Sequence, residues 1–124
     1  MAEVAQHDRE YNWERRREPL SPEEKVVANL RARGLMPVLE PICERLGIML
    51  LEVVGHSKEP SIIRCRHDCW LALRDMKGRD YSYPEIGDMM GGFHHSTIMN
   101  GVDKARWRAA LVKWEELDAE RRVA

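Results

Sequence analysis

The sequence lacks a long apolar run and an even set of cysteines, and each absence excludes a class of protein. Its longest apolar stretch, IMLLEVV, is interrupted by Glu52 and is far shorter than the roughly 20 residues that cross a bilayer. Three cysteines without a signal-peptide pattern argue against a secreted disulfide framework. We therefore expect a cytoplasmic protein with no membrane partner.

The sequence also lacks a strong excess of either charge. A net charge of −1 argues against a strongly basic nucleic-acid-binding protein. The charge is nevertheless uneven, because residues 54–108 contain nine Lys and Arg against seven Asp and Glu, together with four of the five histidines. This distribution permits DNA binding. With 124 residues, the chain is long enough for one domain with extensions but not for two of ordinary size.

Helical signals recur along the chain and no strand-like alternation competes with them, so we expect an all-α fold. Residues 1–20 are expected to form a flexible arm, in which the run ERRRE is more typical of a solvated charge cluster than of a phosphate contact. Residues 21–124 are expected to form one helical domain. Its first helix begins at SPEEK, where Ser21 and Glu24 form a capping box and Pro22 takes the first helical position.

Three further helices are expected before residue 80. The first of these spans about 38–46, and Pro41 lies in its first turn or marks a later start; its expected inward residues are Val38, Ile42, Cys43 and Leu46. A short helix follows in MLLEVV, and HSKEP forms a polar loop. Apolar residues at three- and four-residue steps then predict an amphipathic helix to about Met76. Its inward stripe is Ile62, Cys65, Cys69, Leu73 and Met76, widened by Ile63 and Trp70.

Residues 83–106 combine a short helix, a glycine turn and a longer helix, which is the pattern of a helix-turn-helix. Gly87 lets the two helices approach closely, and Gly91 and Gly92 supply backbone angles that strain other residues. The second helix has polar residues first and apolar residues later. It is expected to continue past Ala105 through Leu117, because no proline or glycine follows Ala105.

The first residues of that second helix are chemically suited to the edges of DNA bases. They are His94, His95, Ser96 and Thr97. Their side chains donate or accept hydrogen bonds, and the Thr97 methyl group can pack against a thymine methyl group. A recognition helix enters the major groove with such residues at its N-terminal end. The pattern therefore predicts double-stranded DNA as the partner, although two short helices with a glycine turn also occur in proteins that never bind DNA.

The segment YPEIGDMMGGFHHSTIMNGVDKA resembles the C-terminal DNA-binding domain of the bacterial replication initiator DnaA. It shares the family pattern P-E-I-G-x-x-x-G-G-x-x-H-S-T. Upstream, LLEVVGHSK resembles the family's short helix and basic loop, and RCRH resembles its arginine-rich helix entry. The resemblance covers about residues 38–105. It implies a compact helical domain with the recognition helix in the major groove and the basic loop in the neighbouring minor groove.

The resemblance also implies roles for individual residues. Base contacts fall to His95, Ser96 and Thr97, and a minor-groove contact falls to Lys58. Five residues are expected near phosphates: Arg64, Arg66, His67, Pro84 and Lys104. Two DNA-contacting positions depart from the family, with Phe93 in place of arginine and His94 in place of aspartate, and we expect them to change the preferred bases. No G-x-x-x-x-G-K-[ST] motif occurs, so neither a nucleotide nor another cofactor is expected.

Metal binding and catalysis are alternative interpretations of the same residues. Cys65 and Cys69 share a helix face from which His67 points away, and two thiols do not make a structural zinc site. We therefore expect core cysteines and no metal. Neither His94 nor His95 has a nucleophile at a recognised spacing, so no enzyme is expected.

The C-terminal stretch RWRAALVKWEELDAE is amphipathic, and one of its sides carries Trp107, Leu111, Trp114 and Leu117. We expect this side to pack against the helix that begins after Ser21, and the alternative is a homodimer or partner surface. The sequence thus predicts a non-enzymatic, nucleoid-associated DNA-binding regulator of transcription or replication, of bacterial or phage type. The competing hypothesis is a helical protein-interaction module that does not bind DNA specifically.

Overall fold

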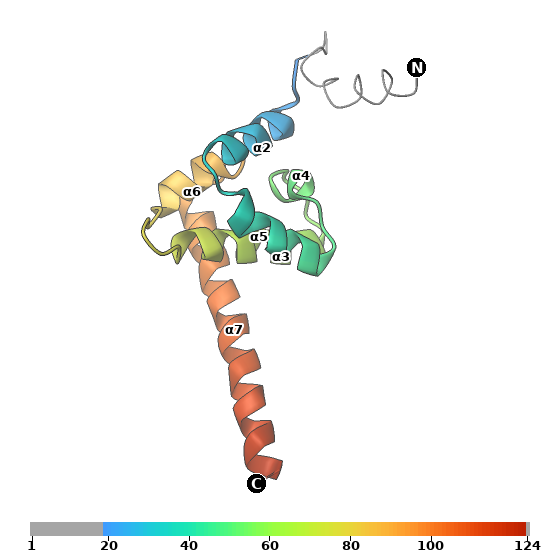
Figure 1. The fold of residues 1–124 in the computed structure, drawn as a ribbon, viewed down its shortest axis with the longest axis vertical. Helices are drawn as coiled ribbons and strands as arrows, with labels where there is room; N and C mark the ends of the chain where they lie inside the picture. Colours follow the sequence, from blue (N-terminus) through green and yellow to red (C-terminus); the bar gives the residue numbers. More distant parts are fainter. Residues whose placement is uncertain (1–18, 124) are drawn as a thin grey trace.

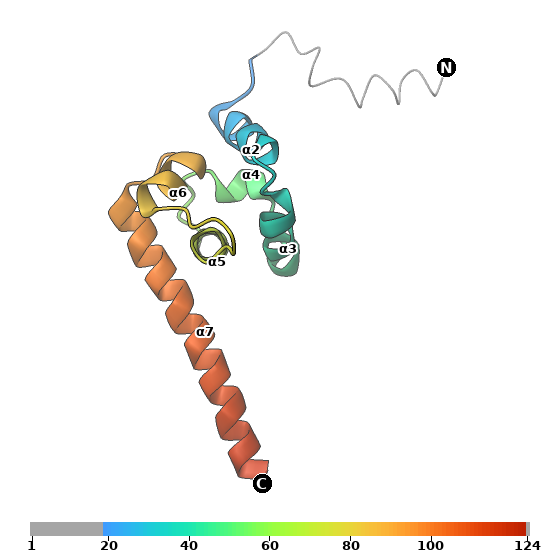
Figure 2. The ribbon, with the colours of Figure 1, turned by 60° about the vertical axis from the view of Figure 1, so that its left-hand side comes forward.

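The computed structural model describes residues 19–123, so nearly all of the expected arm over residues 1–20 lies outside the described part. Within residues 19–123 all regular structure is helical, which confirms the all-α prediction. The helices are α2 (Pro22–Ala32), α3 (Met36–Leu46), α4 (Leu50–Val53), α5 (Pro60–Arg74), α6 (Tyr83–Met89) and α7 (His95–Val123). Helices α2 to α6 form a cluster, and α7 projects from it as a long rod (Figure 1, Figure 2).

Capping boxes fix the starts of two helices. At α2 the backbone N–H of Glu24 donates to Ser21 Oγ at 3.1 Å, and the backbone N–H of Ser21 donates to Glu24 Oε1 at 3.0 Å, as predicted. Ser82 and Glu85 form a second box at α6, which was not predicted. Each box satisfies two backbone donors that have no partner inside the helix. The start of α6, and with it the geometry of the turn that follows, is therefore fixed locally.

Helix α3 begins two residues earlier than predicted, and Pro41 lies inside it rather than in its first turn. A proline at this position removes one backbone hydrogen bond. The helix continues because its inward face is well buried: Leu39 is fully buried and Cys43 is 5% exposed. The other residues predicted to point inward are only partly buried: Val38, Ile42 and Leu46.

Helix α5 is the centre of the fold, because α3, α4, α6 and α7 all pack against it. Four of the five residues of the predicted stripe are buried, and so is Trp70, which is 1% exposed. Met76 lies beyond the end of α5 and, like Ile63, is only partly buried. Burial of one large apolar side chain contributes about 1.5–3 kcal/mol, so this helix supplies much of the core's stability. Helix α5 therefore sets the position of both helices of the helix-turn-helix.

Helix α7 is continuous through Leu117, as predicted, and extends to Val123, but its second half does not pack against α2. Ile98, Val102 and Ala105 are buried where α7 meets α5 and α6. Arg106 and Arg108 still pair with Asp75 and Asp68, and beyond Arg108 the helix leaves the cluster (Figure 1). The residues expected to pack against α2 are exposed: Trp107, Leu111, Trp114 and Leu117. That packing prediction is wrong, because these four side chains face solvent and α7 makes its contacts with α5 and α6. Within residues 19–123, no helix combines the length and apolar character needed to cross a membrane.

Candidate nucleic-acid interface

The turn between α6 and α7 brings two backbone segments into contact at Gly87. The backbone N–H groups of Gly92 and Phe93 both donate to the Gly87 carbonyl oxygen, at 2.9 and 3.0 Å. A Cβ atom at Gly87 would overlap the carbonyl oxygen of Phe93. Gly91 and Gly92 have φ angles of 114° and 83°, which favour glycine. The turn therefore depends on these three glycines, as the sequence predicted.

The N-terminus of α7 is exposed and has no acidic residue in its first turn. His94 precedes the helix, and its carbonyl oxygen accepts hydrogen bonds from the N–H groups of Thr97 and Ile98 at 3.0 and 3.1 Å. All four expected base readers are exposed: His94, His95, Ser96 and Thr97. The positive end of the helix dipole lies at the same place. We call these four residues the α7 tip.

Ser96 fixes the tautomer of His94. The backbone N–H of Ser96 donates to His94 Nδ1 at 3.2 Å, and the Ser96 hydroxyl group lies 2.8 Å from the same nitrogen. Because a backbone N–H can only donate, Nδ1 is the acceptor and the ring proton is on Nε2. The His94 ring lies against His95, with 4.2 Å between the ring centroids. The α7 tip thus presents an imidazole N–H donor at its exposed end.

His56 attaches the loop of residues 55–59 to the helix-turn-helix. Its Nε2 donates to the carbonyl oxygen of Gly91 at 2.9 Å. Its ring stacks on Phe93, with 4.3 Å between the centroids and 18° between the planes. Lys58 is exposed two residues further along the loop. The loop therefore lies beside the α7 tip, although 35 residues separate His56 from Gly91 in the sequence.

Arg66 lies under this loop and is only 5% exposed. Its Nε donates to the carbonyl oxygen of Val53 at 3.0 Å, and its Nη2 donates to those of Gly55 and Ser57 at 2.7 and 3.2 Å. The guanidinium carbon also lies 5.1 Å from the centroid of the Phe93 ring. The structure thus gives Arg66 the role of holding the loop, in place of the expected phosphate contact.

The sequence contained a signal for the burial of Arg66. The residue follows Ile62 by four positions and precedes Trp70 by four, so it lies in the middle of the apolar stripe of α5. Residues at such a position point into the core whatever their charge. The resemblance of RCRH to the family's arginine-rich helix entry implied a phosphate contact instead.

His67 is also buried, and it packs beneath α7. Its ring is tilted against Trp70, with 5.4 Å between the centroids, and its Nδ1 has no hydrogen-bond partner among the described residues. Burial lowers the pKa of His67 to about 4, and the charges of Arg108 and Lys104 add to the effect. His67 is therefore neutral at pH 7 and does not lie at the exposed surface where phosphate contacts were expected.

Most of the other expected DNA-contacting residues are at the surface. Phe93 is the exception, because it is partly buried and also meets the edge of Trp70, with 5.0 Å between the centroids. Its ring therefore belongs to the support of the turn. The exposed residues are Lys58, Arg64, Pro84 and Lys104.

A short helix, a glycine turn and a second helix with an exposed polar N-terminus define a helix-turn-helix protein. Residues 37–105 match the family model described as the bacterial dnaA protein helix-turn-helix. Because this match covers more than half of the 124 residues, the chain belongs to that family. Membership supports DNA binding in general, and a helix-turn-helix of this kind is not a catalytic domain.

Curated relatives are also similar over the same region. The chain is 30% identical over 98 residues to the chromosomal replication initiator protein DnaA of Leptospira biflexa, which covers 77% of this chain and 22% of the relative. The protein of the same name from Thermomicrobium roseum is 36% identical over 67 residues, 54% of this chain and 14% of the relative. The chain thus spans about a fifth, or less, of these relatives. No solved structure is significantly similar to it.

Proposed function

We propose that this protein binds double-stranded DNA sequence-specifically and regulates transcription or replication in a bacterium or phage. The observation that carries the proposal is the contact of His56 with Phe93 and Gly91, because it joins loop 55–59 to the α7 tip. A helix tip and a loop with an exposed lysine, fixed side by side, suit simultaneous entry into a major groove and the adjacent minor groove. The protein would then act in the cytoplasm, associated with the nucleoid.

Each exposed residue has a role in this proposal. The α7 tip reads base edges in the major groove, where the Nε2–H of His94 donates to a base acceptor such as a purine N7. Lys58 enters the minor groove. Arg64, Pro84 and Lys104 lie along the backbone and set affinity and orientation. Arg66, His67 and Phe93 act indirectly, because they are turned inward. Arg66 holds the loop, Phe93 supports the turn, and His67 packs beneath α7.

The proposed domain is residues 21–124, preceded by an arm of residues 1–20. Its initiator-like core spans about 38–105, and the helix-turn-helix spans about 83–106. Within the core, the family's arginine is replaced by Phe93, whose hydrocarbon ring has no hydrogen-bonding group for a base and stacks on His56. We therefore propose a target site that differs from the site of the replication initiators.

Selection of bound sequences from a random duplex library tests this function. We expect a defined motif that differs from the initiator site. An unselected, random pool of bound duplexes would contradict sequence-specific binding. With about three phosphate contacts, the logarithm of the binding constant should fall with the logarithm of salt concentration with a slope of about −3.

Three variants separate base reading from phosphate binding. His95→Ala and Thr97→Ala should each reduce discrimination between the selected site and a mismatched site by about 1–3 kcal/mol. Lys58→Ala should weaken all sequences alike and flatten the salt dependence. Lys113→Ala is the matched control, since Lys113 is exposed on the distal half of α7. If His95→Ala leaves the site preference unchanged, the assignment of the α7 tip is wrong.

A second candidate function is self-association through α7, as a homodimer or as a protein-interaction module. Trp107 is 67% exposed and Trp114 is 61% exposed, and they lie seven residues apart on one face of the helix. Leu111 and Leu117 flank them and are also exposed. We call these four residues the α7 strip. Exposed apolar strips of this kind are typical of interaction surfaces.

A further inference from the structure

Three thiols meet in the core, although the sequence suggested only a pair. Cys65 and Cys69 lie one turn apart on α5, and Cys43 of α3 points toward them. The three sulfur atoms all lie within 4.8 Å of one another, and all three side chains are buried and free of disulfides. Two thiols do not make a metal site, but Cys43 brings a third thiol to Cys65 and Cys69.

The spacing of the sulfur atoms suits one ion held by three thiolates. Bonds of about 2.3 Å from an ion to sulfur place the sulfurs of a three-coordinate site roughly 4 Å apart. Among the described residues, no histidine, carboxylate or further cysteine offers this group a fourth ligand. Structural zinc requires four ligands, so an ion that prefers three is a better match.

Charge selects among the ions that prefer sulfur. Three thiolates around a monovalent ion carry a net charge of −2, and around a divalent ion −1, whereas a trivalent ion gives a neutral complex. The cluster lies in the hydrophobic core, and a buried net charge costs several kcal/mol or more. Trivalent arsenic meets both requirements, because it binds three sulfurs and its lone pair occupies the fourth position.

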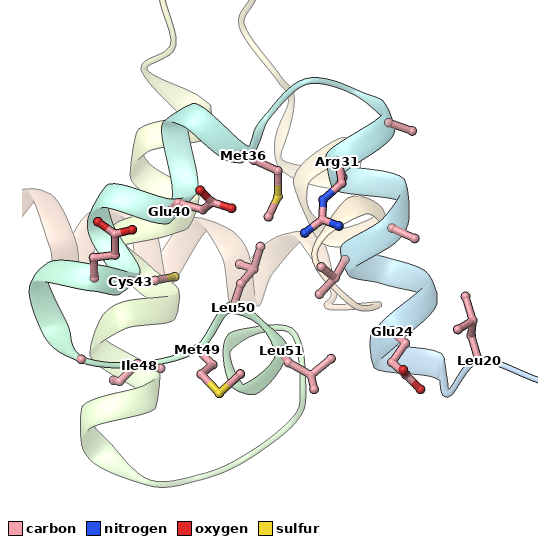
Figure 3. Close-up of a pocket in the computed structure, with 15 residues that line it drawn as sticks. Leu20, Glu24, Arg31, Met36, Glu40, Cys43, Ile48, Met49, Leu50 and Leu51 are labelled. Carbon is pink, nitrogen blue, oxygen red and sulfur yellow. The ribbon is translucent and has the colours of Figure 1, made fainter. Parts of the chain in front are cut away.

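The site also has an entrance. Cys43 lines a groove of about 870 Å³ bounded by α2, α3 and α4 (Figure 3). Arsenite is a small neutral hydroxide at pH 7, which suits entry through an apolar groove.

We propose that Cys43, Cys65 and Cys69 form a binding site for trivalent arsenic, entered from the groove beside Cys43. Three As–S bonds form and three As–OH bonds break. Each thiol proton leaves with a hydroxide as water, so the reaction releases three waters and needs no oxidant or reductant. The complex links α3 to α5 and stabilises the folded chain by binding it selectively.

Titration of the reduced full-length chain with sodium arsenite tests the proposal. Native mass spectrometry should show one arsenic per chain with loss of three protons. Alkylation of the complex should leave all three cysteines unmodified, and the melting temperature should rise. Zinc at the same concentration should protect the thiols less well. Protection of only two cysteines, or tighter binding of zinc than of arsenite, would overturn the proposal.

Single substitutions identify the ligands. Cys43→Ser, Cys65→Ser and Cys69→Ser should each weaken arsenite binding more than about tenfold, because the third bond forms at high effective concentration. Leu39→Ala is the control, since it perturbs the same face of α3 and keeps all three thiols. If a serine variant does not fold, the alkylation pattern of the unmodified chain still shows which cysteines bind arsenic. Unchanged binding in a folded Cys43→Ser variant would contradict the proposed site.

Discussion

At the scale of single residues, burial decides what a basic side chain does in this protein. Arg66 keeps its charge in the core because three carbonyl oxygens accept its hydrogen bonds. His67 has no such partner for its Nδ1, and it avoids the cost of a buried charge by remaining neutral. The two neighbours thus meet the same constraint in different ways, and each supports an element of the proposed interface.

The buried histidine predicts a pH dependence of stability. The pKa of His67 is about 4 in the folded chain and about 6.5 when unfolded. Between these values only the unfolded chain binds the proton, so the free energy of unfolding should fall as pH decreases from about 6.5 to about 4. At pH 5 the loss should reach about 2 kcal/mol, and above pH 7 the residue should contribute nothing.

Urea unfolding of the unmodified chain and of His67→Leu, at pH 7.5 and about pH 5, measures this effect. The leucine variant loses no hydrogen bond at Nδ1, because that atom has no partner among the described residues. Its stability should therefore fall less between the two pH values. An equal fall in both proteins would show that other groups cause the pH dependence.

At the scale of helices, the elements themselves were predictable and their contacts were not. The capping box at Ser21 and the glycines of the turn are local signals, and the structure confirms both. Which faces meet depends on residues far apart in the sequence. The approach of Cys43 to Cys65, and the strip of α7 that faces solvent, follow from the crossing of helices, which periodicity alone does not specify.

The need for glycine at position 101 was not predicted from the sequence. Gly101 lies inside α7, two turns from its start, where glycine costs a helix about 1 kcal/mol relative to alanine. In the structure, a Cβ atom at Gly101 would lie 2.6 Å from ring atoms of both His67 and Trp70. Glycine is therefore required where α7 crosses α5, and this crossing positions the α7 tip.

Gly101→Ala tests that crossing, because two effects of opposite sign compete. Alanine adds up to about 1 kcal/mol of helix propensity, but overlap with two buried rings costs about 1–3 kcal/mol. We expect net destabilisation, measured by urea unfolding. Ala110→Gly, at an exposed position of the same helix, should show the propensity term alone. A gain in stability on Gly101→Ala would mean that the two helices do not cross this closely.

At the scale of the whole molecule, the distal half of α7 is the feature that the cluster of helices does not explain. Its apolar residues extend away from the core (Figure 1). The seven-residue spacing of Trp107 and Trp114 matches the repeat by which two helices pack side by side. If the α7 strip pairs with that of a second copy, the two helix-turn-helix units are related by a two-fold axis.

The two-fold arrangement predicts both the mass of the protein in solution and the form of its DNA site. Light scattering should show a dimer, and Trp107→Glu with Trp114→Glu should give a monomer of unchanged helicity. Ala119→Glu, exposed on another side of α7, is the matched control and should remain dimeric.

A symmetric dimer binds two half-sites arranged as a palindrome, so library selection with the unmodified chain should return paired half-sites. The monomeric variant should return one half-site, because its α7 tip is intact. If the unmodified chain is a monomer in light scattering, self-association is contradicted. Selection of single half-sites by the unmodified chain would lead to the same conclusion.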